Sequence, residues 1–254
     1  TGAILAGASL APIIPPSVLV IIIGTLANVS IAGMLSAGIL PGLMLATMFL
    51  IYALGRVRFN PSLAPEDAAT STVDVSLGEK LRAILRVMPF ALIIFCVMGL
   101  ILLGIATPSE SAATGVVGSM ITAAYYRKLN WKMISESLSS AAFIASMILV
   151  IMASSKMFSQ LLAFTGSTRE LTQVVAGLDL SAYLMLFIMM LIPFILCMFI
   201  DQIALMLVVI PIYQPLIKSL EFDPIWFWLL MLLNVTVGGM TPPFGYTIFA
   251  FKGA

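Results

Sequence analysis

Acidic and hydroxyl side chains lie where long apolar segments of this chain are interrupted. Asp201 is the only acidic residue deep inside an apolar run. A lone carboxylate at membrane depth costs at least about 2.5–3.5 kcal/mol on insertion scales, so it needs a partner or a role. We predict that Asp201 is a sodium ligand or stabilises the tip of a hairpin. The alternative is a helix N-cap, in which the carboxylate accepts hydrogen bonds from the amides that open the next helix.

A second group of candidate ligands lies near the C-terminal end, in the run Gly238-Gly-Met-Thr-Pro-Pro-Phe-Gly245. Glycine weakens a helix, and proline removes a donor and clashes with the preceding turn, so this run cannot form one continuous helix. Released carbonyls and a hydroxyl are the oxygen donors that a sodium ion requires. The pattern predicts a sodium site formed by Gly238, Gly239, Thr241 and Pro242. A kink that only improves packing is the alternative.

A similar break lies near the beginning of the chain, in Leu10-Ala-Pro-Ile-Ile-Pro-Pro-Ser17. An unwound backbone at membrane depth is tolerated only where protein or a water-filled cavity surrounds it. We predict a matching sodium site formed by Ile13, Ile14 and Ser17. Half of that site is expected from a hairpin preceding residue 1, because the chain is interpreted as a piece of a longer polypeptide.

Lys156 is a cation inside an otherwise apolar span. It could hold the carboxylate of a substrate in a cavity. The alternative is that its ammonium group reaches toward the outer headgroups while its stem stays among apolar atoms.

The composition excludes several classes of protein. Of the 254 residues, 61% are hydrophobic and 9% are charged, whereas soluble domains carry about 25% charged residues. The apolar runs are continuous rather than alternating, which predicts an all-α polytopic membrane protein and not a barrel. The net charge of +1 gives no sign of nucleic-acid binding.

The two Pro-Pro breaks, each followed by an apolar run of membrane length, predict a transporter with its site near the membrane centre. An enzyme and a channel are the alternative functions. A membrane-embedded enzyme would need a nucleophile–base pair or a metal cluster, and the chain has no histidine and one buried acid. We therefore expect no enzyme and no cofactor. A channel would need a continuous polar lining, whereas the polar groups here gather at two points.

The chain divides into apolar segments separated by polar ones. Clusters of Lys and Arg within residues 56–86 and 127–132 are expected on the cytoplasmic side, and the loop predicted for residues 165–180 on the outer side. Amphipathic helices are predicted at the membrane surface, over residues 77–87 and 129–140. The predicted spans cover residues 3–29 (broken), 31–54, 88–105, 112–126, 141–164 and 222–251 (broken).

The segment 180–220 has two interpretations. It is either two full spans with Asp201 at a surface, or a re-entrant hairpin with Asp201 near the membrane centre. Pro193, Pro211 and Pro215 favour shortened helices and therefore the hairpin.

The two broken helices cross the membrane in opposite directions, as expected of an inverted-topology repeat. Residues 1–30 are predicted as the broken helix of the first repeat, in the transport domain. Residues 31–87 are predicted as a scaffold span with a cytoplasmic loop and interfacial helix, and residues 88–165 as scaffold and arm helices. Residues 166–254 are predicted as a periplasmic loop, the re-entrant hairpin and the second broken helix, again in the transport domain.

Four motifs in this order resemble the large membrane subunit of TRAP (tripartite ATP-independent periplasmic) transporters. The resemblance extends over nearly the whole chain. The motifs are Ala11-Pro-Ile-Ile-Pro-Pro-Ser17, Gly104-Ile-Ala-Thr-Pro-Ser-Glu-Ser-Ala-Ala113, Phe199-Ile-Asp-Gln-Ile-Ala204 with Ile210-Pro-Ile-Tyr-Gln-Pro215, and Gly239-Met-Thr-Pro-Pro-Phe-Gly245.

This resemblance implies sodium-driven uptake of an organic acid such as a dicarboxylate or sialic acid, across a bacterial inner membrane. It implies an elevator mechanism, in which hairpins and broken helices slide against a fixed scaffold. It also implies two partners, a periplasmic substrate-binding protein and a small four-helix membrane subunit. Lys156 departs from the family, which usually has a small or apolar residue there.

Overall fold

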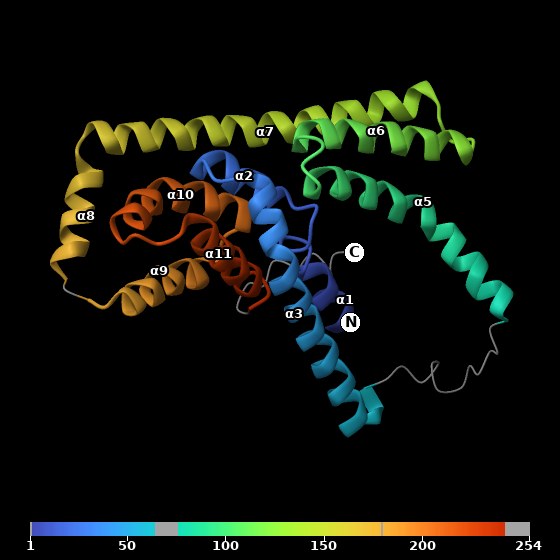
Figure 1. Cartoon of the computed structure of the whole chain (residues 1–254), viewed down its shortest axis with the longest axis horizontal. Coiled ribbons are helices and arrows are strands. Elements are labelled where there is room, and N and C mark those ends of the chain that lie inside the picture. Colours follow the sequence, from blue (N-terminus) through green and yellow to red (C-terminus); the bar gives the residue numbers. More distant parts are fainter. Residues whose placement is uncertain (1, 64–75, 179, 242–254) are drawn as a thin grey trace.

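The computed structural model describes residues 2–63, 76–178 and 180–241 of the chain. All regular structure in these ranges is helical, as predicted (Figure 1). The helices are α1 (Gly2–Ser9), α2 (Val18–Ala27), α3 (Ile31–Phe59), the short 3₁₀ helix η1 (Pro61–Leu63), α5 (Leu77–Leu102), α6 (Pro108–Tyr125), α7 (Trp131–Phe164), α8 (Ser167–Gly177), α9 (Ala182–Cys197), α10 (Gln202–Ser219) and α11 (Pro224–Gly238).

Within the described ranges, α3, α5, α7 and α10 are long and apolar enough to cross a membrane, and α2, α9 and α11 are shorter apolar helices. These lengths and compositions confirm an all-α polytopic membrane protein. The large exposed apolar side chains on α5, α6 and α7 suit a lipid-facing surface, and they would be costly in water.

The packed core lies among α2, α3, α9, α10 and α11, which meet on one side of the molecule (Figure 1). Its fully buried side chains include Trp228 and Phe227 of α11, Ile23 of α2, Met34 of α3 and Met206 of α10. The pair α5–α6 lies on the other side, and α7 runs past both groups. The helices that carry the two predicted breaks therefore share one core.

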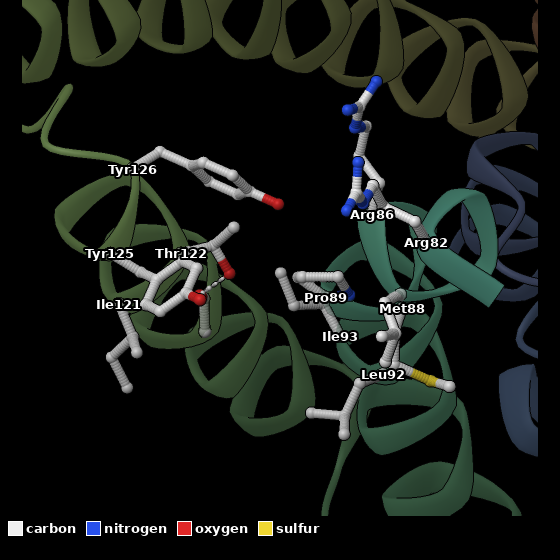
Figure 2. Close-up of a pocket in the computed structure, with 12 residues that line it drawn as sticks. Arg82, Arg86, Met88, Pro89, Leu92, Ile93, Ile121, Thr122, Tyr125 and Tyr126 are labelled. Atoms are coloured by element: carbon white, nitrogen blue, oxygen red, sulfur yellow. Dashed lines mark hydrogen bonds between the residues drawn. The ribbon is translucent and has the colours of Figure 1, made fainter. Parts of the chain in front are cut away.

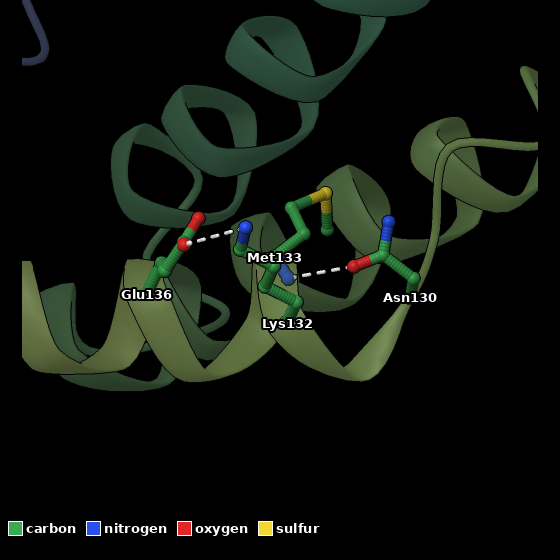
Figure 3. A network of polar contacts seen from close by, with 4 residues as sticks. All are labelled: Asn130, Lys132, Met133 and Glu136. Atoms are coloured by element: carbon green, nitrogen blue, oxygen red, sulfur yellow. Dashed lines mark hydrogen bonds and ion pairs between the residues drawn. The ribbon is translucent and has the colours of Figure 1, made fainter.

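Local sequence signals explain where several helices begin. Thr107 and Glu110 form a capping box at the start of α6, with Pro108 in the first helical turn. The α6 helix therefore starts at Pro108, four residues before the predicted span. Asn130 caps α7 through its Oδ1, which accepts a 2.7 Å hydrogen bond from the Met133 amide (Figure 3).

Two predicted divisions between an interfacial helix and a membrane span were wrong. The predicted interfacial helix and span over residues 77–105 form one helix, α5, and those over residues 129–164 form α7. No proline or glycine breaks residues 131–164, so a single helix of about 51 Å is sterically free to continue.

The segment predicted as a loop over residues 165–180 contains α8. Gly166, with a φ of 78°, ends α7 in a left-handed conformation that glycine adopts readily. Its position allows the chain to start the new helix at Ser167.

Candidate functional site

The apolar segment 180–220 folds as two helices, α9 and α10, joined by a tight turn at residues 198–201. Asp201 is the N-cap of α10, and its Oδ2 accepts hydrogen bonds from the amides of Ile203 at 2.9 Å and Ala204 at 3.3 Å. The capping alternative is therefore present in the structure. The side chain is exposed, so a capping role leaves it accessible to an ion. The sodium role of Asp201 stays a prediction.

The turn of this hairpin contacts the end of α11. Gln202 donates from Nε2 to the Val235 carbonyl at 3.1 Å, and the Cys197 thiol approaches the same oxygen at 3.2 Å. The Gly239 amide also donates to this oxygen, at 2.9 Å. Three donors occupy a carbonyl with two lone pairs, so the Val235 oxygen serves the hairpin contact and leaves cation binding to other groups.

Gly238 allows this close approach. A Cβ atom at this position would lie 3.1 Å from the Phe194 carbonyl and 3.1 Å from the Cys197 Cβ. At Gly239 a Cβ would collide with the Gln202 side-chain amide. Both predicted site glycines thus lie where the hairpin turn meets α11, and their lack of a side chain brings the two backbones together.

The α11 helix ends at Gly238, inside the predicted break. Beyond it the Thr241 amide donates to the Gly238 carbonyl at 3.0 Å, and the Thr241 hydroxyl donates to the Val237 carbonyl at 2.8 Å. A hydroxyl that donates its proton still has lone pairs for a cation. Pro242, the last member of this predicted site, lies outside the described residues.

The first break separates α1 from α2. The Ser17 hydroxyl donates to the Pro12 carbonyl at 2.5 Å and accepts the Val20 amide at 3.3 Å, so it closes the break and caps α2. Ile13 is fully buried, and Ile14 is 37% exposed.

Two glycines of α3 allow this interrupted segment to pack closely against the helix. A Cβ at Gly38 would lie 3.1 Å from the Ile13 carbonyl, and a Cβ at Gly42 would lie 3.0 Å from the Ile14 side chain. The structure therefore brings Ile13, Ile14 and Ser17 together in one irregular segment against α3. Their ligation of sodium stays a prediction.

Lys156 lies on the rim of a small polar cavity of about 130 Å³ between α2, α7 and α10, and its side chain is exposed. Its neighbours there include Asn28, Ser155, Ser159 and Gln214. This position is compatible with a Lys156 that holds a substrate carboxylate in the cavity, and equally with one whose ammonium group reaches toward the outer headgroups.

The contacts around this cavity were missed by the sequence reasoning. Pro211 has no amide proton, so the Leu207 carbonyl loses its normal partner in α10. The Ser155 hydroxyl donates to that carbonyl at 2.5 Å. Gln214 donates to the Ala27 carbonyl at 2.9 Å and so completes the end of α2. Pro211 is the sequence signal that could have indicated this contact. It deprives the Leu207 carbonyl of its helical donor, and a carbonyl in an apolar core needs another donor.

The long apolar helices and the hydrogen-bonded contacts between interrupted helices define a polytopic membrane protein. Comparison with known families makes this specific. Residues 1–253 match the family described as "Tripartite ATP-independent periplasmic transporter, DctM component". The chain belongs to this family, which confirms the resemblance drawn from its four motifs.

Several relatives are named for different solutes. The ectoine/5-hydroxyectoine TRAP transporter large permease protein of Ruegeria pomeroyi is 29% identical over 93% of this chain and 54% of its own length. The C4-dicarboxylate TRAP transporter large permease protein of Pseudomonas aeruginosa is 28% identical over 93% of this chain and 54% of its own. The sialic acid TRAP transporter permease protein of Haemophilus influenzae is 29% identical over 94% and 38%.

The chain spans about half the length of most of these relatives. All three are named as transporter permeases, which are not enzymes, and this agrees with the expectation of no enzyme.

Proposed function

We propose that this chain is part of a sodium-coupled secondary transporter that imports an organic acid. Two relatives are named for a C4-dicarboxylate and for sialic acid, and both names describe acids. The observation that carries the sodium proposal is the contact of the α9–α10 turn with the end of α11 through Gln202 and Val235.

This contact joins the two elements that hold the candidate ligands. Asp201 directly precedes Gln202 at the start of α10, and Thr241 follows the end of α11. The Asp201 carboxylate and the Thr241 hydroxyl supply oxygens, and backbone carbonyls at the end of α11, from Gly238 and Gly239, supply more, as interrupted helices do in other ion-coupled transporters. Pro242 is the last predicted member of this site. Ile13, Ile14 and Ser17 form the corresponding site at the first break.

We further propose how the chain moves and which partners it has. Residues 1–30 and 166–254 form a mobile unit that carries the solute past a scaffold formed by residues 31–165. A periplasmic binding protein delivers the acid, and a small four-helix membrane subunit completes the transporter in the bacterial inner membrane.

A channel is the competing function. It would equilibrate the solute, whereas a sodium symporter concentrates it. The test uses the full-length protein with its partners in proteoliposomes. Accumulation of a labelled dicarboxylate or sialic acid above the outside concentration, only with an inward sodium gradient, supports the proposal. Equilibration at the same rate with potassium in place of sodium would favour the channel.

A further inference from the structure

A large groove lies between α5 and α6 (Figure 2). These two helices lie on the other side of the molecule from α9, α10 and α11 (Figure 1). The two helices are packed tightly near Gly115 and Gly118, where an added Cβ would lie 2.9 Å from Val97 and 3.1 Å from Ile93. Toward the start of α5 and the end of α6 they leave a groove of about 710 Å³.

The groove has a charged end and an apolar body. Arg82 and Arg86 lie at the charged end, and the Tyr126 hydroxyl points into the opening on the same side (Figure 2). Apolar side chains line the remainder of the groove, including Met88, Pro89, Leu92, Ile93 and Ile121.

A second hollow, of about 650 Å³, adjoins the first. The two share Arg86, Ile93, Thr122 and Tyr126, and the second adds Lys128. Arg86 and Tyr126 therefore line both hollows, whereas Arg82 lines the first and Lys128 the second. These three cations are called the basic cluster of the groove.

The cations of this cluster are not balanced by acids in the part of the chain that the structure describes. Glu79, the acid nearest in sequence, is used in the capping box of α5. The nearby Lys132 is different, because Glu136 lies 3.8 Å from its ammonium group (Figure 3). Arg82, Arg86 and Lys128 thus leave a net positive charge beside an apolar surface.

We propose that this groove binds one anionic phospholipid. Its phosphate would lie at Arg82, Arg86 and Lys128, with the Tyr126 hydroxyl as an additional donor, and its two acyl chains would fill the two hollows. Arginine donates paired hydrogen bonds to phosphate, and basic residues next to a membrane attract anionic lipids. A soluble anion could pair with the cations, but it has no acyl chains to bury against the apolar walls. This inference does not depend on the proposed transport function.

Binding is measured by native mass spectrometry of the full-length protein, with phosphatidylglycerol and phosphatidylcholine of equal chain length as probes. The wild type should bind phosphatidylglycerol more tightly. In the double variant Arg82→Gln/Arg86→Gln, phosphatidylglycerol binding should weaken roughly 30-fold, since each surface cation contributes on the order of 1 kcal/mol. Phosphatidylcholine binding should change little.

The matched control is Arg56→Gln/Arg58→Gln, which removes two exposed arginines from the end of α3 and leaves the groove intact. A third variant, Ile121→Trp, fills the apolar body and retains every charge. It should weaken phosphatidylglycerol binding and leave the binding of inorganic phosphate unchanged, which separates a lipid from a free anion. Thermal unfolding checks that all variants are folded.

Three outcomes would overturn the proposal. One is equal phosphatidylglycerol binding by the wild type and the Arg82/Arg86 variant, and another is an equal loss in the α3 control. The third comes from a photo-cross-linking side chain placed at position 121 in the assembled transporter. It should attach to phospholipid, and attachment to a polypeptide instead would assign the groove to a protein partner.

Discussion

At the scale of single residues, Asp201 combines two properties that are separable by substitution. Its Oδ2 caps α10 through two amides, and its charge is exposed at the hairpin turn. Asparagine is about as good an N-cap as aspartate, whereas alanine at an N-cap costs about 1 kcal/mol. Asparagine therefore removes the charge and retains the cap.

We predict that Asp201→Asn leaves the unfolding midpoint almost unchanged and raises the sodium concentration needed for half-maximal uptake. The Asp201→Ala variant should show the same sodium defect and also unfold more easily. The control is Asp223→Asn, because Asp223 caps α11 by the same chemistry. If Asp201→Asn needs the same sodium concentration as the wild type for half-maximal uptake, Asp201 acts only as a helix cap.

Glu110 gives a prediction for pH dependence. Its Oε2 accepts the Thr107 amide at 2.7 Å and the Thr107 hydroxyl at 2.8 Å. These bonds, the amide first, lower the pKa of the Glu110 carboxyl below its ordinary value of 4.5. A lowered pKa means that the ionised carboxylate stabilises the folded state above pH 4.5, and that this contribution disappears as the pH falls through the lower, folded-state pKa.

The wild type should therefore be more thermostable than Glu110→Gln at neutral pH, and the two midpoints should converge in acid. Thermal unfolding of both proteins across a pH series measures this difference. A gap between them that stays constant down to about pH 3 would show that the charge of Glu110 has no part in the stability.

At the scale of elements, α7 and α10 are joined where a proline interrupts hydrogen bonding. Ser155 donates to the Leu207 carbonyl, which Pro211 leaves without its helical donor. We predict that Ser155→Ala lowers the free energy of unfolding by about 1–3 kcal/mol, the usual cost of an unsatisfied buried polar group.

A second substitution tests the cause. Pro211→Ala restores an amide that can donate to Leu207, so Ser155→Ala should cost much less in that background. Ser159→Ala, one turn further along α7 and lining the same cavity, is the control. Equal costs of Ser155→Ala with and without Pro211 would refute the proposed pairing.

The sequence predicted some elements well because their signals are local. Pro12, Pro15 and Pro16 interrupt a helix wherever it packs, so the first break could be located without a structure. Gly238 and Gly239 likewise marked the end of α11. The continuity of α5 and α7 had no such signal. Residues 131–164 contain no proline or glycine that would separate an interfacial helix from a span, and Pro89 does not end α5.

The candidate sites were only partly predictable for a related reason. Asp201 and Thr241 have residue types that suggest ion binding by themselves. Gln202 and Gln214 are ordinary polar residues, and their importance comes from carbonyls on α11 and α2, 33 and 187 residues away in sequence. Such partners are known only once the fold brings the helices together.

At the scale of the whole molecule, the distribution of basic residues predicts the orientation in the membrane. The start of α5 should face the cytoplasm and α8 the periplasm. With Cys96 and Cys197 replaced by serine, single cysteines at Lys80 and Glu170 test this in intact cells. A membrane-impermeant maleimide should label Glu170→Cys and spare Lys80→Cys. The opposite pattern would invert the assigned topology.

The proposed transport motion must accommodate the packing of the described residues. The predicted boundary at residue 165 places Ser155 on the scaffold and Leu207 on the mobile unit, yet they share a 2.5 Å hydrogen bond. If the units slide past each other as proposed, this bond must break or α7 must move with α10. The Ser155→Ala variant therefore reports on transport rate as well as on stability.

Sodium binding at the breaks is the central claim, and ligand-linked stability tests it without transport. An ion that binds only the folded state stabilises it by about 2.7 kcal/mol at one hundred times its Kd. For the full-length protein, sodium chloride should raise the unfolding midpoint above that in potassium chloride of equal ionic strength. The sodium effect should shrink in Thr241→Ala, which loses one oxygen ligand. Identical midpoints in sodium and potassium would contradict the account.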